Sequence, residues 1–378
     1  MRLVAVLPGV FLIFMVLWES FETIILPRRV TRPFRLTRLF YRNSWRAFQS
    51  LVRLFPLKQR ETLLSYFGPL SLLLLLSIWA AVIIIGFSLI YWADGSPARM
   101  DNGPAGLFAS LYLSGTNFFT LGLGDVAPRS SLAKLITVLE SGMGLGFLAL
   151  IIGYLPALNQ SFQRREINIS LLDARAGSPP SAVEILKRHK DEIGLQALKL
   201  LLHEWEIWSA EFLESHLSYP VLAYFRSQHD NQSWLAALTA ILDVSSLVMA
   251  GVKGACTRQA ELTFAMARHA IVDLSIVFRR RPQSPNHSRL PSEVFVSLKK
   301  SLEEAGYNAN NHDDFEKKLM ELRGLYEPYA HALSEYFRMP LPPWMPKSNR
   351  PDNWQISTWE SGSAVRRTIR NIEESRHF

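Results

Sequence analysis

Long apolar runs dominate the first 160 residues of the chain. Residues 66–92 form a run of 27 without a charged side chain, which is long enough to cross a bilayer core of about 30 Å with some tilt. Residues 135–158 form another run, which contains one charge, Glu140, and four glycines. Such a composition is typical of a helix that packs against other helices. The pattern predicts two membrane-spanning helices, residues 66–92 and residues 135–158.

A further apolar run, residues 3–26, has two glutamates near its end and could be a span or a cleaved signal peptide. Residues 28–60 hold ten Lys/Arg and no Asp/Glu, whereas residues 93–131 hold two Arg and three Asp. Because basic loops stay in the cytoplasm, the first loop is expected there and the second outside. No A-x-A-like cleavage site follows the run. We therefore expect residues 1–27 to be a third span of a plasma-membrane protein, with the amino terminus outside and the carboxyl-terminal remainder in the cytoplasm.

The basic loop, residues 28–65, shows helical periodicity. Its arginines recur on one side at Arg35, Arg38, Arg42 and Arg46, and apolar residues mark the other side at Phe40, Phe48, Leu51 and Phe55. One interpretation is an interfacial helix whose arginines bind anionic lipid headgroups, at about 1 kcal/mol each. The other is that the arginines only set the topology. Nucleic acid is a poor third partner for a short loop between two spans, and none is expected.

The segment between the spans at 66–92 and 135–158 is too short for a domain, yet it contains a further apolar stretch. A helix start signal, Asn102-Gly103-Pro104, precedes it and predicts a helix over residues 105–118. That helix would be about 21 Å long at 1.5 Å per residue, so it must dip into the membrane and return. Residues 120–125, Thr-Leu-Gly-Leu-Gly-Asp, come next. Irregular backbone at this depth persists only when it is buried in protein or lines an aqueous path.

The alternating glycines of residues 120–125 favour a particular chemistry. Glycine adopts backbone conformations closed to other residues, so a short strand can turn successive carbonyls to one side. Several copies around an axis would form stacked rings of oxygens that replace the hydration shell of a cation. The carboxyl end of the preceding helix adds partial negative charge. These features favour a cation over an anion.

The order of outer helix, re-entrant helix, T-x-G-x-G-D segment and inner helix resembles the pore module of potassium channels, whose usual signature is T-V-G-Y-G-D. The match holds at Thr120, Gly122, Gly124 and Asp125, and the resemblance covers residues 66–156, about a quarter of the chain. It implies that Thr120, Leu121, Gly122, Leu123 and Gly124 bind dehydrated potassium ions, with the first four carbonyls and the Thr120 hydroxyl as ligands. It also implies a homotetramer in which potassium is the permeant ion and no other cofactor is needed.

Two residues depart from the family pattern. Leu123 stands where the family most often has Tyr, so the hydroxyl that braces the filter is missing, and Phe119 replaces a smaller residue before the filter. Conduction therefore follows more directly than potassium selectivity, and a poorly selective cation channel of the same fold remains an alternative.

Further positions in the module have open interpretations. Gly144, 22 residues after Gly122, is either an inner-helix hinge or a point of close packing, and Pro156 either kinks that helix at the pore mouth or ends it. Support for the filter is expected from Asp125, Glu140 and Thr116. Glu140 could lie behind the filter, bonded to Ser114, Thr116 or Asn117. It could instead face a water-filled cavity as a cation site, or be protonated in a packed interface.

The remainder, residues 159–338, changes character, with charges distributed throughout. Helices are expected over residues 195–216, 234–252, 255–278, 292–305 and 315–337. A span at 234–252 would send several arginines outside, so a buried helix of an all-α cytoplasmic bundle is expected there. The proline-rich tail, residues 339–378, is expected to be extended or disordered.

No enzymatic site is expected. His203-Glu204, His229-Asp230 and His312-Asp313 lack the H-E-x-x-H spacing, and no nucleophile and base pair stands out. These groups are expected to be solvated surface.

The composition agrees with a membrane protein. The chain has 378 residues, 48% hydrophobic and 20% charged, with a net charge of +8; residues 28–60 contribute +10, so the rest sums to +8 − 10 = −2. Its single cysteine, Cys256, excludes an intrachain disulfide. The sequence predicts an all-α membrane protein with a tetrameric potassium-channel-type pore, residues 66–158, and an all-α cytoplasmic domain that gates or assembles it. The alternative from another class is a membrane-anchored interaction or enzyme domain with a structural glycine loop.

Overall fold

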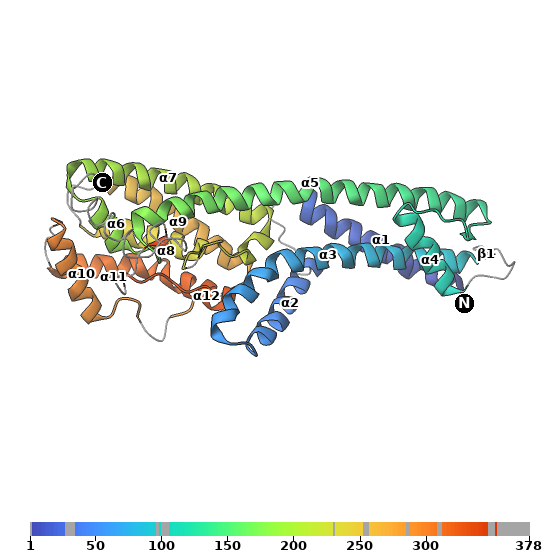
Figure 1. Cartoon of the computed structure of the whole chain (residues 1–378), viewed down its shortest axis with the longest axis horizontal. Coiled ribbons are helices and arrows are strands. Elements are labelled where there is room, and N and C mark those ends of the chain that lie inside the picture. Colours follow the sequence, from blue (N-terminus) through green and yellow to red (C-terminus); the bar gives the residue numbers. More distant parts are fainter. Residues whose placement is uncertain are drawn as a thin grey trace, which may run out of the picture. The chain divides into compact units, whose positions relative to one another are not determined.

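The computed structural model describes residues 2–26, 35–95, 98–99, 106–229, 231–251, 257–284, 288–307, 312–346 and 352–353. The start signal at 102–104, residues 28–34 of the basic loop, Asp230, Cys256 and most of the tail lie outside the described residues. The chain separates into two compact units, Met1–Gln160 (unit 1) and Ser161–Phe378 (unit 2). Helices form nearly all the secondary structure of the described residues (Figure 1).

Unit 1 contains the predicted membrane segments. In chain order its elements are η1 (Arg2–Ala5), α1 (Val6–Ser20), the π-helical turn η2 (Phe21–Ile25), α2 (Leu36–Val52), α3 (Leu57–Asp94), β1 (Ala98–Arg99), α4 (Leu107–Phe118), β2 (Val126–Ala127) and α5 (Ser131–Ala176), which continues into unit 2. Among the described residues, three helices are long and apolar enough to cross a membrane: Leu3–Ile25, Gln59–Asp94 and Ser131–Ala176. The prediction of an all-α membrane protein with three candidate spans is confirmed.

Helices α1 and α3 pack closely because two glycines meet. A Cβ atom added to Gly9 would lie 2.7 Å from the carbonyl oxygen of Gly86, and one added to Gly86 would lie 2.7 Å from the side chain of Ile13. Small residues allow such close backbone approach between membrane helices. Large apolar side chains elsewhere on α1, α3 and α5 stay exposed in the single chain, as expected of surfaces that face lipid or neighbouring protein.

The two glutamates near the end of the first apolar run hold the start of α2. Carboxylate oxygens of Glu19 accept hydrogen bonds from the backbone N–H groups of Leu36 and Thr37, both at 3.2 Å. These N–H groups lack partners within α2, so Glu19 caps the helix. Glu22 lies 3.9 Å from the guanidinium of Arg35. Interactions with Leu36 and Thr37 of α2, and with Arg35 directly before it, thus account for Glu19 and Glu22 in the first apolar run.

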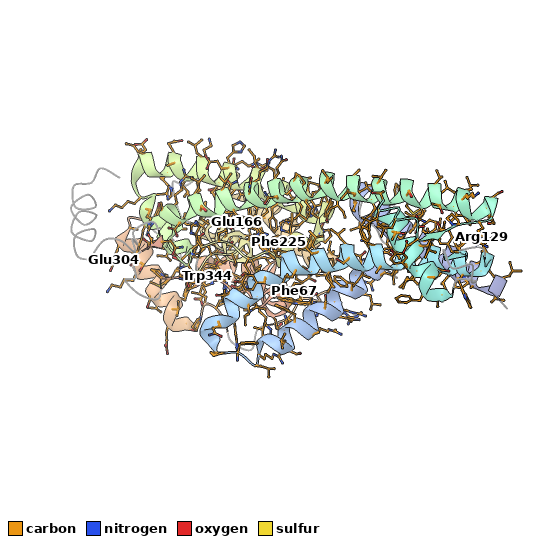
Figure 2. The ribbon with its side chains drawn as sticks, turned by 45° about the vertical axis from the view of Figure 1, so that its right-hand side comes forward. Phe67, Arg129, Glu166, Phe225, Glu304 and Trp344 are labelled. Atoms are coloured by element: carbon orange, nitrogen blue, oxygen red, sulfur yellow. The ribbon has the colours of Figure 1, made fainter. Side chains whose placement is uncertain are left out.

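Helix α2 is the amphipathic helix expected in the basic loop, but its apolar side rests on protein. The ring of Trp45 lies 4.6 Å from that of Phe67 on α3, and Phe48 lies 5.3 Å from the same ring (Figure 2). Trp45 is 1% exposed, whereas Leu51 and Phe55 remain exposed. The sequence pattern identified an amphipathic helix without revealing that α3 covers part of its apolar side.

Helix α5 is longer than predicted. The inner helix was expected over 135–158, but α5 begins at Ser131 and continues to Ala176. Pro156 lies inside it, so the interpretation that this proline ends the helix is wrong. Proline removes one intrahelical hydrogen bond, and the surrounding turns maintain the helix on both sides.

Unit 2 is a helical bundle built around one apolar helix. After α5 come α6 (Ala182–Arg188), α7 (Asp191–Ser218), η3 (Pro220–Tyr224), α8 (Trp234–Ala250), α9 (Thr257–Val277), α10 (Ser292–Glu304), α11 (His312–Gly324) and α12 (Glu327–Phe337). Sixteen of the 17 residues of α8 are buried, and α6, α7, α9, α11 and α12 contact it. The expectation that α8 is a bundle helix is confirmed. The single helix expected at 315–337 is wrong, because a turn at 325–326 separates α11 from α12.

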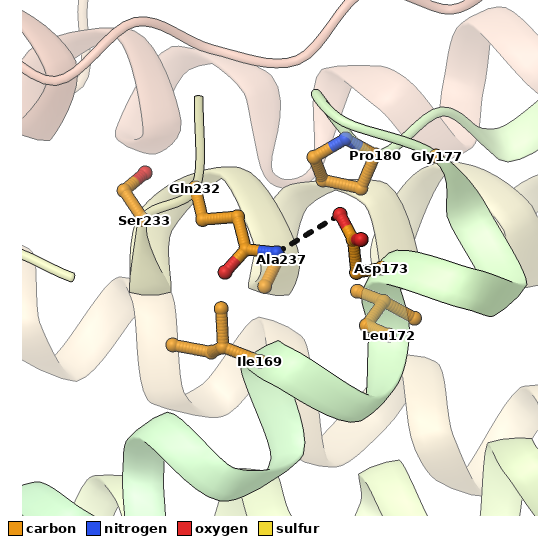
Figure 3. Close-up of a pocket in the computed structure, with 8 residues that line it drawn as sticks. All are labelled: Ile169, Leu172, Asp173, Gly177, Pro180, Gln232, Ser233 and Ala237. Atoms are coloured by element: carbon orange, nitrogen blue, oxygen red, sulfur yellow. Dashed lines mark hydrogen bonds between the residues drawn. The ribbon is translucent and has the colours of Figure 1, made fainter. Parts of the chain in front are cut away.

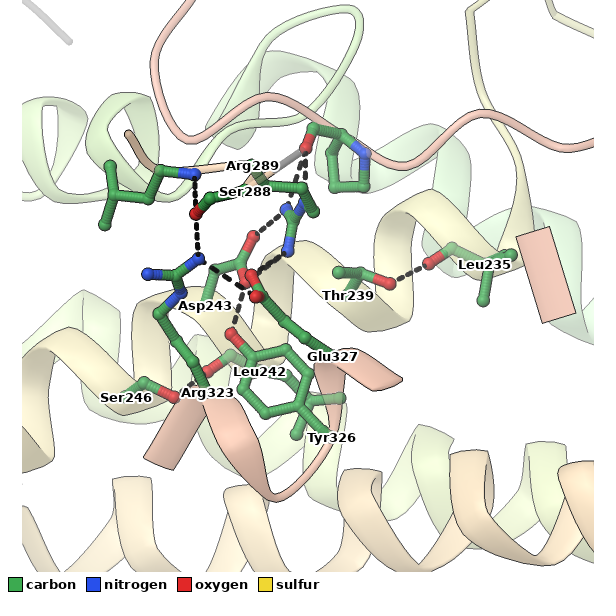
Figure 4. A network of polar contacts seen from close by, with 12 residues as sticks. Leu235, Thr239, Leu242, Asp243, Ser246, Ser288, Arg289, Arg323, Tyr326 and Glu327 are labelled. Carbon is green, nitrogen blue, oxygen red and sulfur yellow. Dashed lines mark hydrogen bonds and ion pairs between the residues drawn. The ribbon is translucent and has the colours of Figure 1, made fainter. Parts of the chain in front are cut away.

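The first part of the tail packs on unit 2, contrary to a boundary at residue 338. Met339 and Trp344 are each 1% exposed. Arg289 donates to the carbonyl oxygen of Pro342 at 2.7 Å and also binds the buried carboxylate of Asp243 (Figure 4). Buried polar groups therefore tie the segment to the core of the bundle.

Candidate functional site

The loop at residues 119–125 begins at the carboxyl end of the short helix α4. The backbone N–H of Leu121 donates to the carbonyl oxygen of Thr116 at 2.7 Å, and that of Gly122 to the same oxygen at 3.4 Å. Thr120 donates to the carbonyl of Asn117 at 3.0 Å. The last carbonyls of α4, which have no partner within the helix, thus fix the first half of the loop.

The backbone of this loop alternates in handedness. Thr120, Gly122 and Gly124 have φ angles of +57°, +54° and +80°, in the left-handed region that glycine tolerates and other residues rarely adopt. Every residue from 119 to 125 is exposed in the single chain, including Leu121 at 62% and Leu123 at 64%. The loop is thus exposed, strained at Thr120 and partly apolar in the single chain.

The loop ends in a short ribbon. Asp125 is exposed at its end, and the next two residues, β2, pair antiparallel with β1, Val126 opposite Arg99.

Glu140 lies in a buried network behind α4. Its Oε1 lies 2.5 Å from the hydroxyl of Ser114 on α4, and its Oε2 accepts a 2.8 Å hydrogen bond from the hydroxyl of Tyr91 on α3. All three residues are fully buried. The network therefore joins α3, α4 and α5 at one point.

Two further polar side chains extend this network. The amide of Asn117 donates to the Tyr91 hydroxyl at 3.4 Å and to the hydroxyl of Thr137 at 3.5 Å. Of the bonds expected for Glu140, the one to Ser114 is present, and Asn117 joins through Tyr91. Thr116 instead donates its hydroxyl to the carbonyl of Leu113. Tyr91 was missed, although it is one of two tyrosines in the apolar run 66–92.

Gly144 is a point of close contact. A Cβ atom added there would lie 2.0 Å from the carbonyl oxygen of Phe118, the last residue of α4. The neighbouring Gly142 and Gly146 face open space within the chain. The geometry favours close packing as the reason for this glycine, while α5 remains helical through it.

The four arginines expected to bind lipid divide into two pairs. Arg35 is half-buried and engaged, with Nη2 donating to Thr23 at 3.2 Å in addition to its contact with Glu22, and Arg38 is half-buried as well. Arg42 and Arg46 are exposed. Lipid binding by the four arginines stays a prediction, and for Arg35 the turn η2 already supplies acceptors in Thr23 and Glu22.

Other chemistry finds little support in the described residues. They contain no group of three or more His, Cys, Asp or Glu side chains placed to hold a metal ion. A small cavity in unit 2 is lined by residues that include Asp173, Gln232 and Pro180 (Figure 3). It has about 10 Å³ of space for a water molecule, which is room for about one water, and Gln232 donates to Asp173 at 3.0 Å.

Comparison with known proteins finds a family similarity in the region of the candidate site. Residues 74–160 match the model of a protein family described as "Ion channel". A curated relative, the "Uncharacterized membrane protein YdjJ" of Bacillus subtilis (strain 168), is 30% identical over 183 residues, which are 48% of this chain and 52% of the relative. The chain thus spans about half the length of that relative. No solved structure matches. The protein is a membrane protein, and its residues 74–160 are similar to a family of ion channels.

Proposed function

We propose that four copies of the chain form a potassium channel, with residues 120–125 as its selectivity filter. One observation carries the proposal: left-handed backbone at Thr120, Gly122 and Gly124 alternates with other conformations in an exposed loop at the end of a helix too short to span. Such a backbone directs successive carbonyls toward a common axis, where four copies would replace the hydration shell of a cation. The family match of residues 74–160 supports the same conclusion.

The same proposal includes an orientation. The basic loop and unit 2 lie in the cytoplasm, and the amino terminus and the loop before α4 lie outside the plasma membrane, following the bias of Lys and Arg. Arg42 and Arg46 face anionic headgroups of the inner leaflet. Unit 2 gates or assembles the pore through α5, which is one unbroken helix from Ser131 to Ala176.

Glu140 is proposed to act as a brace behind the filter. Its carboxyl group links Tyr91 and Ser114 within one buried network, and Ser114 lies on the helix whose end fixes the filter. The brace takes over the stiffening that a tyrosine at Leu123 would supply.

Reconstituted flux tests the function. Full-length protein in lipid vesicles should carry potassium-selective current, and Gly122→Ala should abolish it because alanine is strained at a φ of +54°. Gly142→Ala is the matched control, since a methyl group there meets open space within the chain. Equal sodium and potassium currents would favour the poorly selective cation channel, as the leucine at position 123 allows. No current, or a monomer or dimer in detergent, would favour a membrane-anchored interaction domain.

A further inference from the structure

Arginines gather at one end of unit 2, where α9 and α12 both terminate. The cluster, named here the arginine cluster, consists of Arg226, Arg279, Arg280, Arg281 and Arg338. Arg226 donates to the carbonyl oxygens of Phe337 at 2.6 Å and Arg338 at 3.1 Å. The guanidinium of Arg280 lies 4.0 Å from the ring centre of Tyr336. These contacts bring three separate segments of the chain together.

Helix capping does not account for the whole arginine cluster. Arg226 satisfies the last carbonyls of α12, where a cation is favoured by the helix dipole. At the end of α9, however, backbone N–H groups satisfy the last carbonyls. The N–H of Arg280 donates to the carbonyl oxygen of Ser275 at 2.7 Å, and that of Arg279 to the carbonyl oxygen of Ile276 at 3.0 Å. The side chains of Arg279, Arg281 and Arg338 are exposed. Their charges are therefore available to something outside the bundle.

In the part of the chain that the structure describes, no ion pair joins Arg279, Arg280, Arg281 or Arg338 to an Asp or Glu. The Nε of Arg280 is buried without a hydrogen-bond partner in the same part of the chain. The like charges of these four arginines repel each other, so the arrangement suits an anionic ligand. Guanidinium groups match the geometry of phosphate oxygens in particular.

The position of the arginine cluster along the chain favours phosphate on a membrane. The cluster is continuous with the contacts that receive α5 in unit 2: Arg165 donates to the carbonyl of Phe225 at 3.0 Å, and the ring of Phe162 lies 5.7 Å from that of Phe225 (Figure 2). Phe225 directly precedes Arg226. Phe162 follows the last residue of the apolar run, Leu158, by only about 6 Å of helix at 1.5 Å per residue. Only a few residues of α5 thus lie between the end of the apolar run and the residues of α5 that contact Phe225, the neighbour of Arg226.

We propose that the arginine cluster binds the phosphate headgroups of anionic lipids in the leaflet from which α5 emerges. This surface is separate from the arginines of α2. The proposal rests on the membrane span of α5 and not on potassium conduction, so either can fail without the other.

Lipid binding by the full-length protein tests the proposal. Protein in neutral detergent would be titrated with phosphatidylglycerol or phosphatidylcholine, and retained lipid measured by native mass spectrometry. The test variant combines Arg279→Gln, Arg281→Gln and Arg338→Gln. The control combines Lys199→Gln, Arg258→Gln and Lys300→Gln, which removes the same charge from exposed positions elsewhere in unit 2. Thermal unfolding of each variant establishes that it is folded, and an Arg→Lys version of the test variant keeps the charge if the Gln version unfolds.

The expected result is selective. An arginine near anionic headgroups contributes about fivefold in affinity, so the test variant should bind phosphatidylglycerol on the order of 100-fold more weakly, with phosphatidylcholine unaffected. The control should stay within about twofold of the parent. An equal loss of phosphatidylglycerol affinity in both variants would show an effect of net charge. No loss of affinity in the test variant would mean that the lipid binds elsewhere, as at Arg42 and Arg46. Competition by millimolar inorganic phosphate would identify a soluble anion as the ligand. Each of these three results would overturn the proposal.

Discussion

The hydroxyl of Ser114 lies between two acceptors, the carboxyl of Glu140 at 2.5 Å and the carbonyl oxygen of Ile84 at 2.8 Å. A hydroxyl carries one hydrogen and can donate to one of them at a time. The arrangement is fully satisfied when Glu140 carries a proton and donates to Ser114, which then donates to Ile84. A carboxylic acid at Glu140 therefore links α5 to Ser114 on α4, and Ser114 in turn links α4 to Ile84 on α3.

Replacement of Glu140 tests this arrangement. Glu140→Gln should keep most of the stability, because its amide can donate to Ser114 as a protonated carboxyl does. Glu140→Ala leaves the hydroxyls of Ser114 and Tyr91 short of a buried partner, at about 1–3 kcal/mol. Thermal unfolding of the detergent-solubilised protein measures both. Equal losses in the two variants would mean that the carboxylate charge, and not a hydrogen-bonded acid, is required.

Tyr91→Phe should be milder than Glu140→Ala. It deletes one hydroxyl from the network and costs about 0.5–1.5 kcal/mol. Tyr66→Phe is the matched control on the same helix, because Tyr66 is 53% exposed. Potassium flux and unfolding temperature should change for Tyr91→Phe and stay at the parent value for the control. If both tyrosine variants behave alike, the proposed role of the network as a brace is wrong.

The sequence predicted much of unit 1 because membrane segments are defined by composition. Apolar length gave the candidate spans, and the glycine pattern gave the loop at 120–125. The end of α5 was placed 18 residues too early, since charges after Leu158 mark the end of the apolar run and not the end of the helix. Composition indicates whether a helix lies in lipid or in water, but its backbone hydrogen bonds continue from one environment into the other.

Contacts between segments distant in sequence could not be predicted in the same way. Tyr91 and Glu140 are 49 residues apart, and nothing in either position marks the other as its partner. The capping of α2 by Glu19 spans 18 residues, and the pairing of Asp243 with Arg289 spans 46. Each arises when helices pack, so a single sequence shows the polar residue without its partner.

Gly144→Ala should destabilise the module because the new methyl group would meet the backbone carbonyl of Phe118. Backbone cannot move aside as a flexible side chain can, and overpacking of this kind costs typically about 1–3 kcal/mol. Gly146→Ala is the control: nothing lies within 4 Å of its added Cβ in the chain, and alanine gains about 1 kcal/mol of helix propensity. Unfolding in detergent should therefore shift down for Gly144→Ala and up or not at all for Gly146→Ala. A hinge role without close packing would leave the stability of Gly144→Ala unchanged.

Arg289→Gln should be among the most destabilising single changes in unit 2. Arg289 contacts the carboxylates of Asp243 and Glu327 (Figure 4). Its removal leaves the buried carboxylate of Asp243 without its cation, at about 3–5 kcal/mol, while Glu327 keeps its ion pair with Arg323 at 3.0 Å. The exposed pair of Arg175 and Glu204 offers a control, since Arg175→Gln should cost less than about 1 kcal/mol. Chemical denaturation of the full chain, followed by tryptophan fluorescence, compares the two. Similar midpoints would mean that the network contributes no more than a surface pair.

His216 makes the stability of unit 2 depend on pH. Its Nδ1 lies 2.7 Å from the carbonyl oxygen of Phe212 and its Nε2 lies 3.4 Å from Nη1 of Arg165, which can only donate. The ring is therefore neutral, with the proton on Nδ1. Burial lowers the pKa of His216 well below its ordinary value, and the charge of Arg165 lowers it further.

A depressed histidine pKa fixes the direction of the pH effect. Above about pH 6.5 the ring is neutral in both the folded and the unfolded chain, and its full contribution is present. Below that pH the unfolded chain takes up a proton that the folded chain does not, so stability falls by up to about 1.4 kcal/mol per pH unit. His216→Gln should flatten the part of the unfolding profile between pH 6.5 and 5 that this ring causes. His203→Gln, on an exposed part of the same helix, should leave the profile unchanged, and an equal flattening by both would place the proton uptake elsewhere.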